Sequence, residues 1–305
     1  MKSTFKLVLV MLLVCLVSIY LTPLVYSFLP MFKFEKIFNR LIMIFTISAA
    51  FIFVLKNQRK SGRPWSEFWK DLGFDFSAPW KKLLIYGFLS GSLAVAFIVA
   101  WETAFGPRYL RSPISIQDII ERFFKGATSG ILVGIIEEFF FRGFVFNFLR
   151  KRIPVVLAVA LASAFYSMTH FFDNGQIFIP QRPSASDGFR LLVGYLEPFK
   201  NHLPEIFPQF FGLFVFGIVL CVAFLRSNSL FLSIGIHAGA VFSIKFQHSF
   251  IRKPLEDLHY SIFGNSVDYD GPFEWFILAL LGLVLWYVIL PRLTKNPPPS
   301  GPTAR

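Results

Sequence analysis

The chain has 305 residues, 55% of them hydrophobic and 16% charged, with 41 Phe and a formal net charge of +12. About a quarter of the residues in a soluble domain are charged, so this composition excludes an ordinary soluble globular protein. The Lys and Arg residues lie mostly in short loops beside apolar runs, which is typical of topology-setting charge and of contact with anionic lipid. We therefore expect a multi-pass protein of the lipid bilayer with no nucleic-acid partner.

Apolar runs long enough to cross a bilayer recur along the whole chain, and each should be a helix because lipid cannot satisfy backbone polar groups. The expected spans are 6–28, 38–55, 83–104, 127–149, 153–171, 209–225, 229–246 and 273–291. The first lacks an A-x-A cleavage pattern and is long for a signal peptide, so we expect it to be retained. The predicted fold is all-α, a polytopic bundle of about eight transmembrane helices plus an interfacial amphipathic helix.

The loop after the second span is rich in Lys and Arg, and the positive-inside rule places such loops in the cytoplasm. This orientation also puts the basic cluster 150–152, Arg226 and the basic residues of both chain ends on the cytoplasmic side. Those terminal residues are Lys2, Lys6, Arg292 and Lys295. Both termini are therefore expected to be cytoplasmic.

Two segments outside the spans have patterns of their own. Residues 115–126 begin with Ser-x-x-Asp and space their Ile and Phe residues helically, which predicts an interfacial helix that stops at Gly126. Residues 172–208 form a long loop with several Pro, which fits equally a lid or recognition loop and a solvated connection. The predicted parts are N-terminal spans with a cytoplasmic loop (1–70), a membrane core (71–246), a loop with the last span (247–291) and a disordered tail (292–305).

The stretch GIIEEFFFRGF, residues 134–144, places Glu137, Glu138 and Arg142 inside the fourth span. A charged side chain at mid-membrane costs about 2.5–3.5 kcal/mol even on the lenient insertion scale, so it indicates a functional site. Glu138 and Arg142 lie about 40° apart around a helix, which favours a structural ion pair. Glu137 has no evident partner along the helix and suits a general base or acid. The alternative is that all three are structural.

Two histidines also lie in apolar spans. His170 closes the fifth span in FYSMTHFF, and His237 lies in the seventh in SIGIHAGAVF. A lone membrane histidine is often only a hydrogen bond between helices. Because His170, His237 and Glu137 come from three spans, we expect them to converge on one polar cavity. The remaining histidines lie outside the spans and are expected at the surface: His202, His248 and His259.

Four stretches resemble one known family. EEFFFR (137–142) fits its EExxxR motif, YSMTH (166–170) resembles its FxxxH motif with Tyr166 in place of Phe, and SIGIHAGAV (233–241) resembles its final His motif. DLGFDFSAPWKKLLIYGFLSG (71–91) is similar to its cytoplasmic lead-in. These motifs resemble those of the CAAX prenyl protease and bacteriocin-processing (CPBP, or Abi) family of intramembrane glutamic-type endopeptidases.

The resemblance implies hydrolysis of a peptide bond in a membrane-anchored protein or peptide, within a bundle of membrane helices. Glu137 would activate a water with help from His170, and His237 would help to stabilise the oxyanion. Glu138 and Arg142 would hold the site in shape. Amide hydrolysis needs these parts, namely a base, a polarised water and a donor aimed at the developing negative charge.

The resemblance breaks at one position. The family commonly has Asn or Asp four residues after the final His, as a second oxyanion donor, whereas this chain has Val241. Loss of such a donor can cost about 2.7–4 kcal/mol. Either another group substitutes, such as Ser233 or a backbone N–H near Gly239, or activity is weak or lost. The HAGxVF form also resembles a bacterial branch associated with C-terminal sorting signals, which implies a bacterial inner membrane.

Three alternatives stay open. The same fold could be a non-catalytic binding or immunity protein, which Val241 favours. Glu137 and the histidines could instead serve a transporter or proton relay, although the spans show no inverted repeat. Glu137, His170 and His237 could also bind zinc. Since HExxH is absent and the resemblance favours water activated by Glu and His alone, we expect no cofactor.

Overall fold

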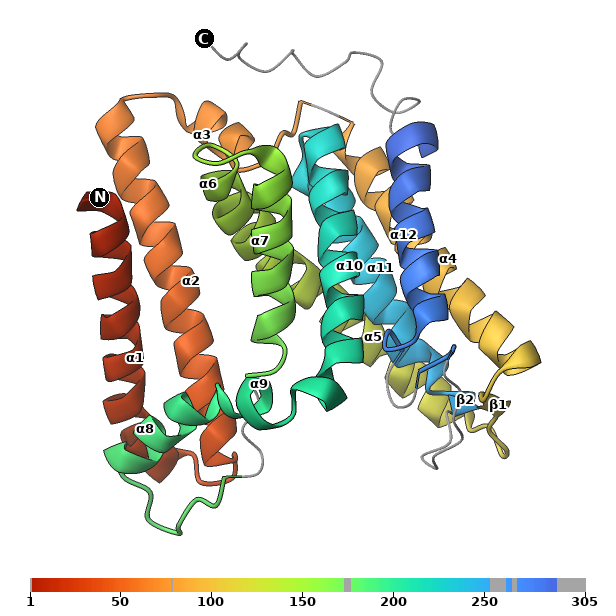
Figure 1. Cartoon of the computed structure of the whole chain (residues 1–305), viewed down its shortest axis with the longest axis horizontal. Helices are drawn as coiled ribbons and strands as arrows, with labels where there is room; N and C mark the ends of the chain where they lie inside the picture. The colour runs from red at the N-terminus through yellow and green to blue at the C-terminus, as the bar shows by residue number, and fades with distance from the viewer. Residues whose placement is uncertain (1, 78, 173–176, 253–261, 265–267, 290–305) are drawn as a thin grey trace. The chain divides into compact units, whose positions relative to one another are not determined.

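Helices make up most of the computed structural model (Figure 1), which describes residues 2–77, 79–172, 177–252, 262–264 and 268–289. In chain order the helices are α1 (Lys2–Phe28), α2 (Phe34–Ser61), α3 (Trp65–Asp71), α4 (Trp80–Phe105), α5 (Ile116–Glu138), the π-helix η1 (Phe139–Phe146), α6 (Asn147–Leu149), α7 (Val155–Thr169), α8 (Ala185–Gly194), α9 (Glu197–Asn201), α10 (Leu203–Ser227), α11 (Leu230–Gln247), α12 (Pro272–Val284) and the π-helix η2 (Leu285–Ile289). A short antiparallel pair joins β1 (Tyr109–Leu110) to β2 (Ile251–Arg252), with Tyr109 opposite Arg252.

The first seven predicted spans each correspond to one of these helices or to the continuous run α5–η1–α6, and the described part of the eighth corresponds to α12 and η2. Five stretches are long and apolar enough, by length and composition, to cross a membrane: Leu9–Phe28, Phe34–Lys60, Trp80–Phe105, Leu203–Ser227 and Leu230–Gln247. Two further apolar helices are shorter, Val155–Thr169 and Pro272–Tyr287. The chain is an all-α, polytopic integral membrane protein, as predicted.

The predicted helix stop at Gly126 is wrong. Helix α5 runs without a break from Ile116 to Glu138, and Gly126 lies inside it. This glycine packs against the backbone of Phe242 on α11. Its role is therefore to allow close contact between the two helices and not to end α5. The segment that was expected to lie in the interface is the first part of α5.

The expectation of a long loop at residues 172–208 is also wrong, because this segment contains α8, α9 and the start of α10. Helix α8 begins with a capping box, in which the side chains of Ser184 and Asp187 bond to each other's backbone N–H groups. The predicted tail 292–305 and His259 lie outside the described residues.

The chain groups by its internal contacts into two units. Unit 1 comprises Met1–Arg63 and Met168–Ile206, and unit 2 comprises Pro64–Ser167 and Phe207–Arg305. The segment 168–206, which falls within the expected core 71–246, thus groups with the N-terminal helices.

In unit 1, α8 packs on the first two helices. Their shared apolar cluster consists of Ile19, Phe34, Phe38, Leu191 and Tyr195. The Tyr195 hydroxyl donates to the side-chain oxygen of Asn39 at 2.6 Å, and its ring stacks on Phe172 with centroids 4.8 Å apart. The segment once expected to be a loop is therefore folded onto α1 and α2.

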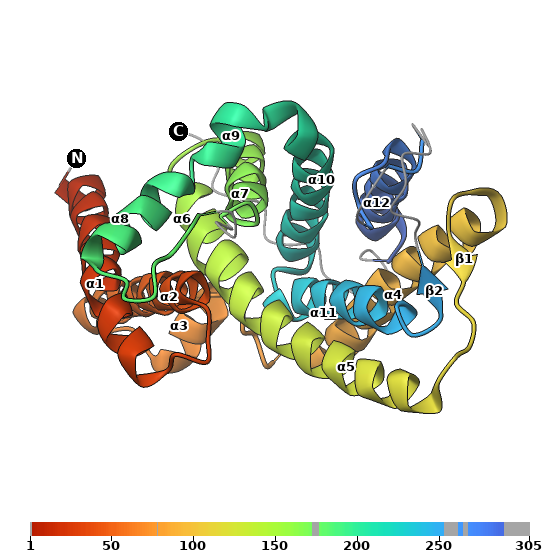
Figure 2. The ribbon, with the colours of Figure 1, turned by 90° about the horizontal axis from the view of Figure 1, so that it is seen from below.

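In unit 2, α11 lies between α4 and α5 (Figure 2), and small residues line both contacts. The glycines at these contacts are Gly87 and Gly91 on α4, Gly126, Gly130 and Gly134 on α5, and Gly235 and Gly239 on α11. In lipid, apolar side chains gain little by leaving the membrane for a helix contact, so close packing of backbones has to hold the helices together.

The glycine stripe on α5 also determines the direction of Glu138. The buried residues of this helix are Gly126, Gly130, Gly134 and Glu138, each four residues after the last, so they share one face. A Cβ on Gly130 would lie 2.6 Å from the carbonyl oxygen of Ala238, closer than real contacts allow. Glu138 therefore faces α11, whereas the preceding glutamate points about 100° away.

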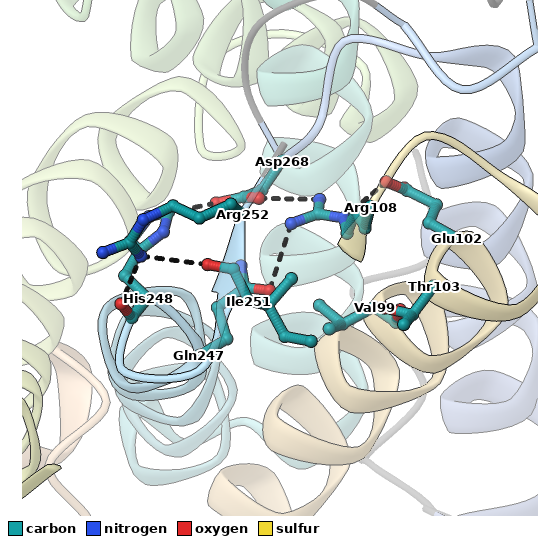
Figure 3. A network of polar contacts seen from close by, with 9 residues as sticks. All are labelled: Val99, Glu102, Thr103, Arg108, Gln247, His248, Ile251, Arg252 and Asp268. Carbon is teal, nitrogen blue, oxygen red and sulfur yellow. Dashed lines mark hydrogen bonds and ion pairs between the residues drawn. The ribbon is translucent and has the colours of Figure 1, made fainter. Parts of the chain in front are cut away.

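Arg108 ties the end of α4 to the end of α11 (Figure 3). Its buried guanidinium donates to the side chains of Glu102 at 2.5 Å, Gln247 at 3.1 Å and Asp268 at 2.7 Å. Burial alone would lower the pKa of Arg108, but the charges of Asp268 and Glu102 outweigh burial and raise it. The cation is therefore permanent and braces the helix pair at the end remote from α3.

We predict that Gly130→Ala destabilises the protein, because the new methyl group must displace the backbone of Ala238. Overpacking of this kind costs about 1–3 kcal/mol, so thermal unfolding in detergent should show a lower midpoint. Gly282→Ala in α12 is the matched control, since its Cβ would meet the Val219 side chain at an ordinary 3.4 Å. Equal midpoints for the two variants would contradict the close packing of α5 on α11.

Candidate active site

The ionisable stretch lies where the helix changes its hydrogen-bond pattern. Helix α5 ends at Glu138, and the π-helix η1 continues the chain through Phe139–Phe146. Helical turns of the π type are rare and are frequently found at functional sites. The Phe-rich order of residues fits an ordinary α-helix equally well, so the sequence alone gives no sign of this change.

Glu138 and Arg142 form the predicted ion pair. Arg142 Nη1 lies 2.9 Å from Glu138 Oε1, and both side chains are almost wholly buried. Arg142 Nη2 donates to the backbone carbonyl of Gly217 on α10 at 3.2 Å. The arginine therefore neutralises Glu138 and links η1 to α10.

His237 contacts both glutamates with different ring nitrogens. Its Nδ1 lies 2.9 Å from Glu138 Oε1, and its Nε2 lies 3.9 Å from Glu137 Oε2. A carboxylate can only accept hydrogen bonds, so Nδ1 carries a proton and donates a hydrogen bond to Glu138. This bond fixes the orientation of the ring, with Nε2 facing Glu137.

The two adjacent glutamates have different surroundings. The Glu138 side chain is 0% exposed, whereas that of Glu137 is 28% exposed. Glu138 contacts Arg142 and His237, while Glu137 approaches the imidazole of His237 from the other side. Glu138 is therefore held in place by its contacts, whereas the Glu137 side chain is partly exposed, with its Oε2 buried against His237.

Aromatic side chains enclose this charged group. Tyr166 on α7 lies edge to face with His237 and under the Arg142 guanidinium, whose carbon is 4.6 Å from the tyrosine ring centroid. Phe216 also lies edge to face with the histidine, at 5.5 Å. In such apolar surroundings, electrostatic interactions are stronger than in water. In the sequence, Tyr166 stands out only as a motif variant, and nothing in the sequence marks Phe216.

The structure leaves one predicted member of the site undecided. His170 follows Thr169, the last residue of α7, and belongs to unit 1, whereas the other site residues belong to unit 2. Its convergence with Glu137 therefore stays a prediction. Ser233 is fully buried on α11, donates to the Leu230 carbonyl at 3.1 Å and also interacts with Glu138.

The histidines expected at the surface differ in exposure. His202 is exposed and lies 3.2 Å from Glu197. His248 is half-buried beside Asp268, and burial lowers the pKa of its imidazole while the carboxylate opposes the change. Neither lies among the site residues described above. Among the described residues, no three His, Cys, Asp or Glu side chains form a group that could hold a metal ion.

Comparison with known proteins identifies the segment that contains this arrangement. Residues 120–243 match the family model described as type II CAAX prenyl endopeptidase Rce1-like. This segment is similar to the Rce1-like family. No curated protein and no solved structure matches the chain.

The Rce1-like segment includes all the predicted site residues and Val241. The family is one of CAAX prenyl endopeptidases, which are peptide hydrolases. Within residues 120–243, one continuous chain of contacts runs from Arg142 through Glu138 and His237 to Glu137.

We predict that Arg142→Met destabilises the protein strongly, because it leaves the buried Glu138 carboxylate without its cation. Breaking a buried pair in this way costs about 3–5 kcal/mol. The control is Lys125→Met, which breaks the exposed pair of Lys125 with Glu121, also four residues apart on the same run of helix. Exposed pairs contribute about 0–1 kcal/mol. Chemical unfolding in detergent should separate the variants, and similar losses would contradict the structural role of Arg142.

Proposed function

We propose that the protein is an intramembrane endopeptidase that hydrolyses a peptide bond of a membrane-anchored protein or peptide. The observation that carries this proposal is the approach of Glu137 Oε2 to His237 Nε2, at 3.9 Å, inside an apolar bundle. A water beside these two atoms could bond to both, which is the geometry that general base catalysis needs. The Rce1-like match of the same segment supports this assignment.

In the proposed reaction, Glu137 takes a proton from the water while the water oxygen attacks the scissile carbonyl carbon. The carbonyl electron pair moves onto its oxygen and gives a tetrahedral oxyanion. His237, as the imidazolium, donates its Nε2–H to that oxygen, and the Glu138 carboxylate at Nδ1 stabilises the cation. When the C–N bond breaks, Glu137 passes its proton to the leaving nitrogen and returns to the carboxylate.

Two further parts of the proposal depend on the sequence. His170 would assist Glu137 in orienting the water, as the resemblance of YSMTH to the FxxxH motif implies. The basic loops favour an orientation with both termini in the cytoplasm, and the resemblance favours a bacterial inner membrane. The substrate would present a CAAX-like end or a C-terminal sorting signal to the membrane.

A second candidate function is a non-catalytic protein of the same fold that binds or sequesters a peptide. The observation that favours it is Val241, which offers no hydrogen-bond donor one turn after His237. The two candidates differ in whether a bound peptide is cleaved.

We predict that purified protein in liposomes cleaves peptides that end in Cys-aliphatic-aliphatic-X, supplied in farnesylated and unmodified forms and followed by mass spectrometry. Glu137→Gln should lower kcat by about 100-fold or more, because the base is lost. His170→Ala and His237→Ala should also lower kcat. Glu121→Gln, an exposed glutamate earlier on α5, is the matched control and should cleave like the wild type.

The outcomes separate the candidates. If Glu137→Gln, His170→Ala and His237→Ala all cleave like the wild type, the protease proposal is wrong. Peptide binding without cleavage by the wild type would support the sequestering protein. Solute or proton flux that depends on Glu137, without cleavage, would instead indicate a transporter.

We also predict that cleavage is independent of added metal, because Glu137 and His237 already supply the base and the donor. Activity should be unchanged by EDTA or 1,10-phenanthroline. Loss of activity that zinc restores would overturn the metal-free mechanism and assign Glu137, His170 and His237 as metal ligands.

A further inference from the structure

We propose that the hydroxyl of Tyr166 is a second hydrogen-bond donor of this site, directed at the oxyanion of the peptide bond under attack. The inference deepens the proposed function and rests on it. The position that lacks a donor is Val241, which lies four residues after His237 on α11 and has only methyl groups in its side chain. A site with one donor from that helix stabilises an oxyanion less than a site with two.

The substitutes expected from the sequence are already engaged. The Ser233 hydroxyl donates to the carbonyl of Leu230 within its own helix. Gly239 faces α4, where its Cα packs against the backbone of Phe88 and its carbonyl accepts a hydrogen bond from Ser92 at 3.2 Å. Its backbone therefore points toward a helix contact and away from the glutamates.

Tyr166 lies among the charged groups of the site. It is 1% exposed, and its ring centroid lies 6.1 Å from that of His237, with the rings nearly perpendicular. Arg142 covers the ring at 4.6 Å from its centroid. The charges of Glu137, Arg142 and Glu138 all act on the phenol. The phenol therefore lies within the group of charged side chains beside which the water would attack.

The chemistry of a phenol suits this position. A tyrosine hydroxyl keeps its proton near neutral pH and can donate one hydrogen bond. It adds no charge to a site that already holds the carboxylates of Glu137 and Glu138. The ring itself is fixed by packing, because Phe141 lies edge to face with it at 5.1 Å and Arg142 lies on its face. A donor held in this way needs little reorganisation when the oxyanion forms.

The test is Tyr166→Phe in the liposome cleavage assay, since this change removes one oxygen atom and keeps the ring. We expect kcat to fall by about 10²–10³-fold, as for loss of one oxyanion donor, with KM changed less than about twofold. Adding Val241→Asn to this variant should restore much of kcat, because the amide supplies a donor one turn after His237. Val241→Asn alone should raise kcat much less.

Tyr195→Phe is the matched control, because it removes another buried hydroxyl, the one that donates to Asn39 in unit 1. It should lower the thermal midpoint and leave kcat unchanged. Wild-type kcat in Tyr166→Phe, or a loss that Val241→Asn does not restore, would overturn the inference while the protease proposal stands. Absence of any Glu137-dependent cleavage by the wild type would overturn the proposed function and this inference together.

Discussion

The close approach of α11 to α4 and α5 is the constraint on which the site depends. In a membrane, helices associate through backbone contact and polar bonds, since lipid tails solvate apolar side chains as well as another helix does. Glycines at four-residue spacing allow this contact on both faces of α11. Because Glu138 continues the spacing of Gly126, Gly130 and Gly134, the contact that joins the helices also brings its carboxylate to His237.

The electrostatics of the site follow from this packing. A carboxylate at membrane depth is tolerated only with partners, and Glu138 has two, Arg142 and His237. Because the contacts with Arg142 and His237 fix its carboxylate, Glu138 cannot also turn toward a substrate. Glu137, about 100° around the helix, meets the second nitrogen of the same imidazole. Of these two adjacent residues, Glu138 therefore has a structural role, and Glu137 is the one placed for chemistry.

The residue order predicted more of the fold than of the site. Apolar length gave the spans, and helical spacing gave the pair of Glu138 with Arg142, because both depend on neighbours in sequence. The stop assigned to Gly126 failed because glycine ends helices in water but lines helix contacts in lipid. The π-helix after Glu138 and the contact of Arg142 with Gly217 depend on tertiary packing, for which local sequence carries no signal.

Close packing through a small residue also positions Tyr166, the aromatic side chain of α7 that lies against the site, because α7 contacts α10 at Gly217. Gly217 lies against Ser163, since a Cβ built on it would be 2.9 Å from the serine Cβ. This approach leaves the Gly217 carbonyl open to Arg142 Nη2 and brings the following turn of α7 toward η1. Tyr166 lies three residues after Ser163, on nearly the same face, and so meets the guanidinium. One small residue on α10 therefore positions both the cation that neutralises Glu138 and the ring that covers it.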